Sequence, residues 1–67
     1  MNVTMNLFHT SIEIDGHTVA SASKTHKGWR WFSNVGRAGN KLDFDSKAAA
    51  LTAAAKCLGL KINEVIE

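Results

Sequence analysis

One segment of this 67-residue chain has the pattern of a helix, and its composition limits what can pack against it. The segment DSKAAALTAAAKCLG spans residues 45–59. Ser46 or Asp45 can accept the unpaired amide hydrogens of the first turn, Lys56 suits the C-terminal dipole, and Gly59 permits a left-handed stop. Because the helix offers mostly alanine, the layer opposite it must supply bulky side chains.

The apolar side chains of this segment predict which face is buried. At helical spacing, Leu51 and Leu58 share a stripe with Ala50, Ala54 and Cys57. We therefore expect the thiol to be an inert core group. The same stripe of small residues can also serve as the face of a homodimer, which would add buried area to a short chain. Monomer and homodimer stay open as alternatives.

The segment SIEIDGHTVASAS, residues 11–23, has the pattern of a β-hairpin. Its DG dipeptide is the preferred sequence of a two-residue type I′ turn, because both central residues must take positive φ. This turn pairs Ile14 with His17 and predicts that Ile12 lies opposite Val19.

The other strands follow from alternation and turn residues. The apolar alternation changes phase at residues 7–8, which predicts a bulge or a bend there. Residues 25–28 are predicted to form a turn into a strand over residues 29–34, and residues 36–40 a loop into a return strand over residues 41–44.

These elements predict an α+β fold in a single small domain, residues 1–67. The fold is an antiparallel meander of three to four strands, with one C-terminal α-helix packed on one face. Residues 60–67 alternate weakly, but they also place apolar side chains at the spacing of one helical turn, so the pattern favours a short final helix over a further strand.

Alternation divides the aromatic residues of WRWFSNVGRAGNK, residues 29–41, between the two faces of the sheet. Trp29 and Trp31 are expected to face the alanine helix, joined by Leu42 and Phe44 from the return strand.

The opposite face is expected to be open. We place Arg30, Phe32 and Asn34 on it, beside Lys41 and Asp43 of the return strand and Lys24 or Ala22 of the preceding strand.

The basic residues are concentrated in the same part of the chain. The net charge is only +2, yet residues 24–41 contain five basic residues and no acidic one. Cations can hold phosphates while an aromatic ring between them stacks on a base. The sequence therefore predicts a non-enzymatic nucleic-acid-binding module with a basic, aromatic hairpin. Its candidate binding residues are Lys24, Lys27, Arg30, Phe32, Arg37 and Lys41.

Two stretches, GWRWFSNVGRAGNKLDF and DSKAAALTAAA, are similar to the second hairpin and helix of a family of three-stranded-sheet DNA-binding domains. These domains occur in plant ethylene-response-type transcription factors and as arm-binding domains of tyrosine recombinases. In that family the sheet enters the major groove. The resemblance implies DNA rather than RNA as ligand, contacted by Arg30, Phe32, Arg37 and Lys41.

A protein partner is the alternative. Small strand-rich proteins with a terminal helix also occur among phage and mobile-element proteins that inhibit a host nucleoprotein defence complex, of the anti-restriction or anti-CRISPR type. Arginine and phenylalanine together also suit a protein interface. The two hypotheses predict different surfaces. A continuous basic strip favours nucleic acid, whereas a patch interrupted by Asp43 favours a protein. Asp43 is expected to pair with Lys41 or Arg30 across the sheet.

Other classes of function lack a pattern in the sequence. His9, His17 and His26 do not have the spacing of a metal site, and no segment combines a nucleophile, a base and an oxyanion site. We expect no catalytic residue, metal or cofactor. Residues 1–8 have neither a positive charge nor a long apolar run, and a single cysteine suits a reducing compartment, so we expect a cytoplasmic protein without a membrane span.

Overall fold

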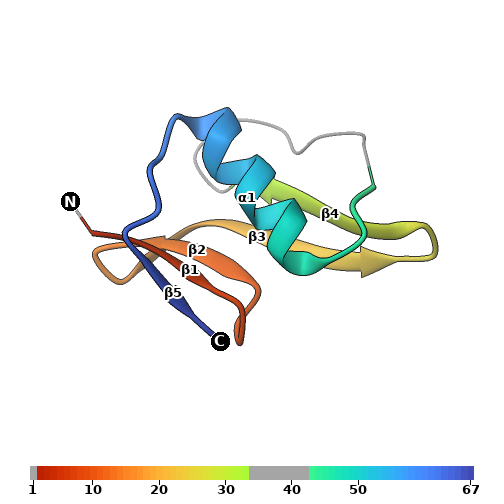
Figure 1. The fold of residues 1–67 in the computed structure, drawn as a ribbon, viewed down its shortest axis with the longest axis horizontal. Helices are drawn as coiled ribbons and strands as arrows, with labels where there is room; N and C mark the ends of the chain where they lie inside the picture. The colour runs from red at the N-terminus through yellow and green to blue at the C-terminus, as the bar shows by residue number, and fades with distance from the viewer. Residues whose placement is uncertain (1, 34–42) are drawn as a thin grey trace.

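The computed structural model describes residues 2–33 and 43–67 and places one helix on a five-stranded sheet (Figure 1). In chain order, the elements are β1 (Val3–Asn6), β2 (Ser11–Ile14), β3 (His17–Thr25), β4 (Gly28–Ser33), α1 (Lys47–Leu58) and β5 (Glu64–Ile66). The strand order is β4-β3-β2-β1-β5. The predicted α+β class and the antiparallel meander of the first four strands are confirmed, but β5 makes the sheet mixed, because it runs parallel to β1.

The β2–β3 turn has the predicted type and is followed by an irregularity. Asp15 and Gly16 have φ of 50° and 86°, and Ile14 pairs with His17 as expected. The next predicted pair is wrong, because the register shifts and Ile12 lies opposite Ala20. This β-bulge turns a small side chain toward the helix, where Ile12 and Ala20 are both fully buried.

The phase change at residues 7–8 corresponds to a reversal of the chain. A turn over residues 7–10 joins β1 to β2, and Thr10 takes a φ of 52° within it. Residues on the two sides of the turn then pair across neighbouring strands, for example Met5 with Ile12. The apolar residues before the turn and those after it can therefore lie on the same face of the sheet.

The helix begins and ends where its sequence predicts. The Ser46 side chain accepts the Ala49 N–H at 3.1 Å, and Gly59 ends the helix with a φ of 74°. The buried residues are Ala50, Leu51, Ala54 and Ala55.

One expectation about the helix surface is wrong, and the structure bears on the two alternatives for its alanine face. Cys57 is exposed, because the buried stripe is centred on the side of Leu51 and Ala55 and leaves the thiol at its edge. The alanine face also packs on the sheet of its own chain, so it offers no surface to a second copy: Ala50 and Ala54 are fully buried.

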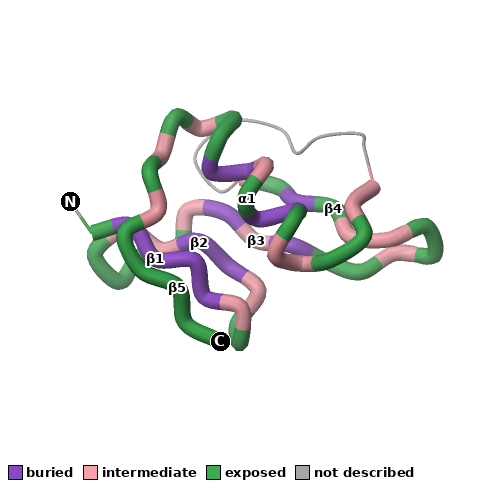
Figure 2. The backbone as a smooth tube through the Cα atoms, in the orientation of Figure 1, coloured by how far each residue is buried: buried purple, intermediate pink, exposed green. Residues whose placement is uncertain are grey.

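The core lies between α1 and the sheet (Figure 2). Trp31 is buried there, as predicted, and Trp29 and Phe44 are half-buried and packed against the core. The predicted return strand is reduced to one antiparallel bridge between Trp29 and Phe44 among the described residues, and Leu42 lies outside them.

The expected final helix is replaced by β5. The side-chain oxygen of Asn63 accepts the Val3 N–H at 2.9 Å, and the backbone N–H of Asn63 donates to the Val3 carbonyl at 2.8 Å. Leu7 then donates to the Ile66 carbonyl at 2.7 Å. Hydrogen bonds to β1 thus outweigh a single helical turn, which has little stability alone.

Across the described residues, no helix combines the length and the hydropathy needed to span a membrane.

Candidate nucleic-acid or protein interface

The predicted binding residues are brought to three different places. Arg30 and Phe32 lie on the outer face of β4, by which we mean the sheet face that does not carry α1, and both are exposed. Lys27 lies in the β3–β4 turn. Lys24 is on β3, while Arg37 and Lys41 lie outside the described residues, as does Asn34.

The placement of Lys24 or Ala22 on the outer face is wrong. The two-residue β3–β4 turn pairs Thr25 with Gly28, so Lys24 is opposite Trp29 and Ala22 is opposite Trp31. Paired residues project to the same side of a sheet, and this side carries the helix. The Lys24 ammonium lies 6.0 Å from the centre of the Trp29 ring, at the outer limit of a cation–π contact.

Serines therefore surround Arg30 and Phe32 on the outer face. Ser23 is opposite Arg30, and Ser21 is opposite Phe32. The ring of Phe32 retains 45% exposure among these small polar neighbours. An exposed aromatic group beside a guanidinium is the most distinctive chemical feature of this face.

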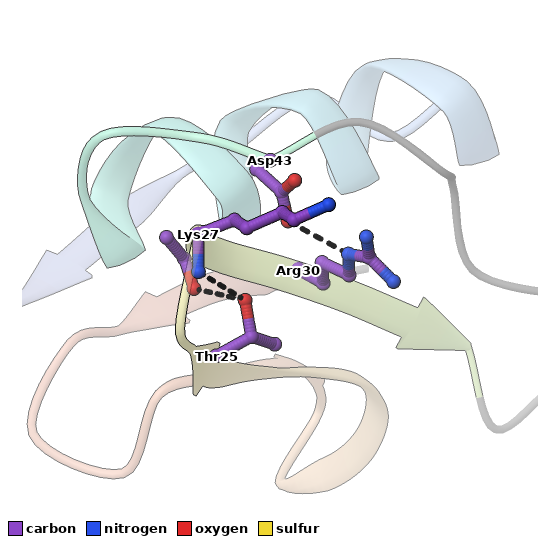
Figure 3. Close-up of polar contacts among 5 residues, drawn as sticks. Thr25, Lys27, Arg30 and Asp43 are labelled. Atoms are coloured by element: carbon purple, nitrogen blue, oxygen red, sulfur yellow. Dashed lines mark hydrogen bonds and ion pairs between the residues drawn. The ribbon is translucent and has the colours of Figure 1, made fainter.

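Asp43 pairs with Arg30, which shares its face of β4 with Phe32. The Arg30 Nε donates to Asp43 Oδ1 at 2.7 Å (Figure 3). The Lys27 side chain extends across the same carboxylate, and the Arg30 terminal nitrogens point away from it (Figure 3). We call Lys27, Arg30, Phe32 and Asp43 the outer patch.

The carboxylate position is fixed by the hairpin turn and by the bridge to β4. Thr25 Oγ1 accepts the Lys27 N–H at 3.2 Å and donates to the Gly28 carbonyl at 3.0 Å. Trp29 and Phe44 exchange two backbone hydrogen bonds of 2.8 Å, so the residue before Phe44 is held against β4. The sequence suggested an Arg30–Asp43 pair as one option. No pattern near Asp43 in the sequence, however, predicts that this segment approaches β4.

The pair changes the ionisation of both groups. The hydrogen bond from Arg30 holds the pKa of Asp43 below its ordinary value of 3.8; partial burial opposes this effect, and the charges of Arg30 and Lys27 reinforce it. The same hydrogen bond raises the pKa of Arg30. At neutral pH Asp43 is therefore ionised and paired with Arg30, so the outer patch contains both signs of charge.

We expect an NMR titration of the Asp43 carboxyl group to show this shift. Its folded-state pKa lies below the unfolded one, so the pair stabilises the fold above pH 3.8 and the effect is lost as pH falls through the folded-state pKa. The variant Arg30→Gln should raise the Asp43 pKa toward its ordinary value. Lys61→Gln, which removes the same charge elsewhere, should leave it unchanged, and an equal response to both variants would contradict the direct pair.

Comparisons with known proteins add no relative. Neither models of known families, nor characterised proteins, nor solved structures gave a match to this chain. The candidate function rests on the outer patch itself.

Proposed function

We propose that this protein is a non-enzymatic protein-binding module and that its partner docks on the outer patch of the β3–β4 hairpin. The observation that carries the proposal is the Arg30–Asp43 pair beside the exposed ring of Phe32. Such a patch combines an apolar anchor with opposite charges in fixed positions. Aromatic and arginine side chains dominate binding energy in protein interfaces.

Electrostatics favours a protein over a nucleic acid at this patch. A phosphate needs cations that no carboxylate opposes, because most of the affinity for nucleic acid comes from neutralised phosphates. Here Asp43 lies at 2.7 Å from the Arg30 Nε and is also flanked by Lys27. A phosphate approaching this site would meet a carboxylate, whereas a protein partner can match both signs of charge.

The geometry also indicates what the partner should provide. The terminal nitrogens of Arg30 point away from Asp43 and can donate to a carbonyl or carboxylate (Figure 3). Asp43 limits the motion of the guanidinium, which lowers the entropy lost on binding. We therefore propose a partner surface with an apolar pocket for Phe32 next to a carbonyl or acidic group. A host nucleoprotein defence complex, inhibited by a small phage or mobile-element protein, is the setting we propose.

Replacing Phe32 with alanine should weaken partner binding by about tenfold or more, because truncation of a central anchor costs about 2 kcal/mol or more. Tagged protein is first used to isolate partners from nuclease-treated lysate of the source cells. The recovered protein is then purified, and its affinity is measured by biolayer interferometry. The fold should be preserved in this variant, because the ring is 45% exposed.

Phe8, in the β1–β2 turn, provides a matched control away from the β3–β4 hairpin. Phe8 is 74% exposed in the β1–β2 turn, so Phe8→Ala removes the same group from a different surface. We expect its affinity to equal that of the native protein. Equal losses from the two variants, or no partner after nuclease treatment, would contradict docking at the outer patch.

Nucleic-acid binding is a second candidate, supported by the end of the hairpin. Lys24, His26 and Lys27 are exposed around the β3–β4 turn, which extends past the start of α1 (Figure 1). The resemblance to three-stranded-sheet DNA-binding domains stays a prediction that supports this candidate. Arg37 and Lys41 belong to it as proposed contacts.

Binding of labelled duplex DNA and of RNA, measured by anisotropy over a series of salt concentrations, separates the two candidates. Contacts to phosphates give a slope of log affinity against log salt of about −0.9 for each phosphate neutralised on duplex DNA. A steep slope that falls when Lys24 and Lys27 are replaced by glutamine would favour nucleic acid. We expect no binding tighter than about 10⁻⁴ M at physiological salt.

A further inference from the structure

One edge of the sheet has no covering element among the described residues. At the β4 edge, the Trp29–Phe44 bridge adds a pairing residue, whereas the opposite edge is the outer side of β5. All three residues of β5 are exposed (Figure 2), and Val65 and Ile66 are 50% and 41% exposed. An exposed strand edge with apolar side chains is a template for pairing with another strand.

The hydrogen bonds to β1 show which backbone groups of β5 are directed outward. The Ile66 carbonyl accepts the Leu7 N–H at 2.7 Å, so the backbone polar groups of Ile66 are directed toward β1. These groups alternate in direction along a strand. The N–H and the carbonyl of Val65 therefore point away from β1, toward the open edge.

We propose that a second copy of this chain occupies the edge, through antiparallel pairing of the two β5 strands centred on Val65. The two valines would exchange both of their outward hydrogen bonds across a twofold axis. The five-stranded sheet would continue into that of the second copy. This proposal is independent of the function assigned to the outer patch.

The sequence of β5 is self-complementary in this register. Glu64 lies opposite Ile66 of the second copy, and Asn63 lies opposite Glu67, so no like charges face each other. A register centred on Glu64 would instead oppose two carboxylates and would place backbone groups that already face β1 at the axis. Only Val65 of β5 directs its backbone groups outward, so backbone direction and charge together select the register centred on Val65.

The small core gives a reason for association. Five of the ten buried apolar residues in the described part of the chain are alanines. Short chains bury a low fraction of their surface, and dimerisation adds to it. Pairing at β5 would cover the two Val65 side chains against each other on the helix side of the sheet.

A charge exchange at Val65 tests the proposal. Val65→Lys and Val65→Glu each place like charges opposite each other at the axis, whereas an equal mixture places opposite charges there. Sedimentation equilibrium should show a dimer for the native chain and a dissociation constant raised by about tenfold or more for each variant. The mixture should recover the dimer as a heterodimer, detected by native mass spectrometry.

Circular dichroism establishes that both variants are folded, which is expected because Val65 is half-exposed. As a matched control, Thr52→Lys changes an exposed residue of α1 and should leave the dimer unchanged. A native chain that remains monomeric at millimolar concentration would overturn the proposal. So would variants that dimerise like the native chain, or a mixture that gains nothing over either variant alone.

Discussion

Replacing Gly28 with alanine should lower the free energy of unfolding by about 2–4 kcal/mol, since a strained backbone and a steric overlap contribute together. Gly28 has a φ of +136°, and a Cβ atom there would lie 2.6 Å from the carbonyl oxygen of Phe44. Neither atom can move aside easily, because Phe44 is held by two backbone bonds to Trp29. Urea unfolding followed by circular dichroism measures the loss.

Gly59 provides the matched control. It also has a positive φ, +74°, but a Cβ atom there would meet nothing within 4 Å. Gly59→Ala should therefore lower the free energy of unfolding by only about 1–2 kcal/mol, the cost of the left-handed conformation alone. If the two variants lose the same amount, the close approach of Phe44 to Gly28 contributes nothing.

The same glycine connects stability to the outer patch. Its missing side chain lets the segment before α1 approach β4, and that approach places Asp43 beside Arg30. A displaced Phe44 would carry Asp43 with it. We expect that any folded fraction of Gly28→Ala shows an Asp43 pKa closer to its ordinary value, for the same reason as Arg30→Gln.

The predictable parts of the fold are those set by local chemistry. Ser46 and Gly59 determine where α1 begins and ends, and the Asp15-Gly16 dipeptide determines the first hairpin turn. Each works through backbone geometry or a hydrogen bond within a few residues. Alternation separates Trp31 from Phe32, and the need for bulky side chains opposite the alanine helix assigns Trp31 to the core and Phe32 to the outer face.

The remaining features depend on contacts distant in sequence. The bulge at β2–β3 changes the register by one residue, and a local alternation pattern does not contain that information. β5 forms within residues 60–67 only because β1 offers partners to Asn63 and Ile66. Lys24 was placed on the wrong face, since its side depends on the register set by the β3–β4 turn.

The candidate site shows the same division. The sequence identified Arg30 and Phe32 from their residue types and their shared side of a strand. For Asp43 the sequence left Lys41 and Arg30 open as partners, and the close approach of the chain at Gly28 is what places its carboxylate against Arg30. A concentration of basic residues in a sequence therefore indicates candidate binding residues, whereas the net charge of the folded surface also depends on which carboxylates pack against them.

Trp31→Ala should have the largest effect on stability of any single substitution considered. The side chain is 3% exposed and is packed in the core that the alanines of α1 help to form, so its removal leaves a cavity that small neighbours cannot fill. Such truncations cost about 3–5 kcal/mol. A domain of this length has about 3–10 kcal/mol of stability in total. We expect the variant to be largely unfolded at 37 °C, as measured by circular dichroism.

Trp29→Ala is the control that distinguishes the stability lost through a core cavity from the stability lost by removing an aromatic ring. Trp29 is half-buried at the border of the core, with its ring partly covered by Lys24, so its removal should cost only about 1–2 kcal/mol. Each variant retains one tryptophan. The fluorescence of Trp31, which remains in Trp29→Ala, should lie at shorter wavelength than that of Trp29, which remains in Trp31→Ala. If the two variants are equally stable, the alanine helix does not depend on a bulky partner at Trp31. The packing argument that assigned the tryptophans to the core would then be wrong, because a helix of small side chains could form a core without a bulky side chain opposite it.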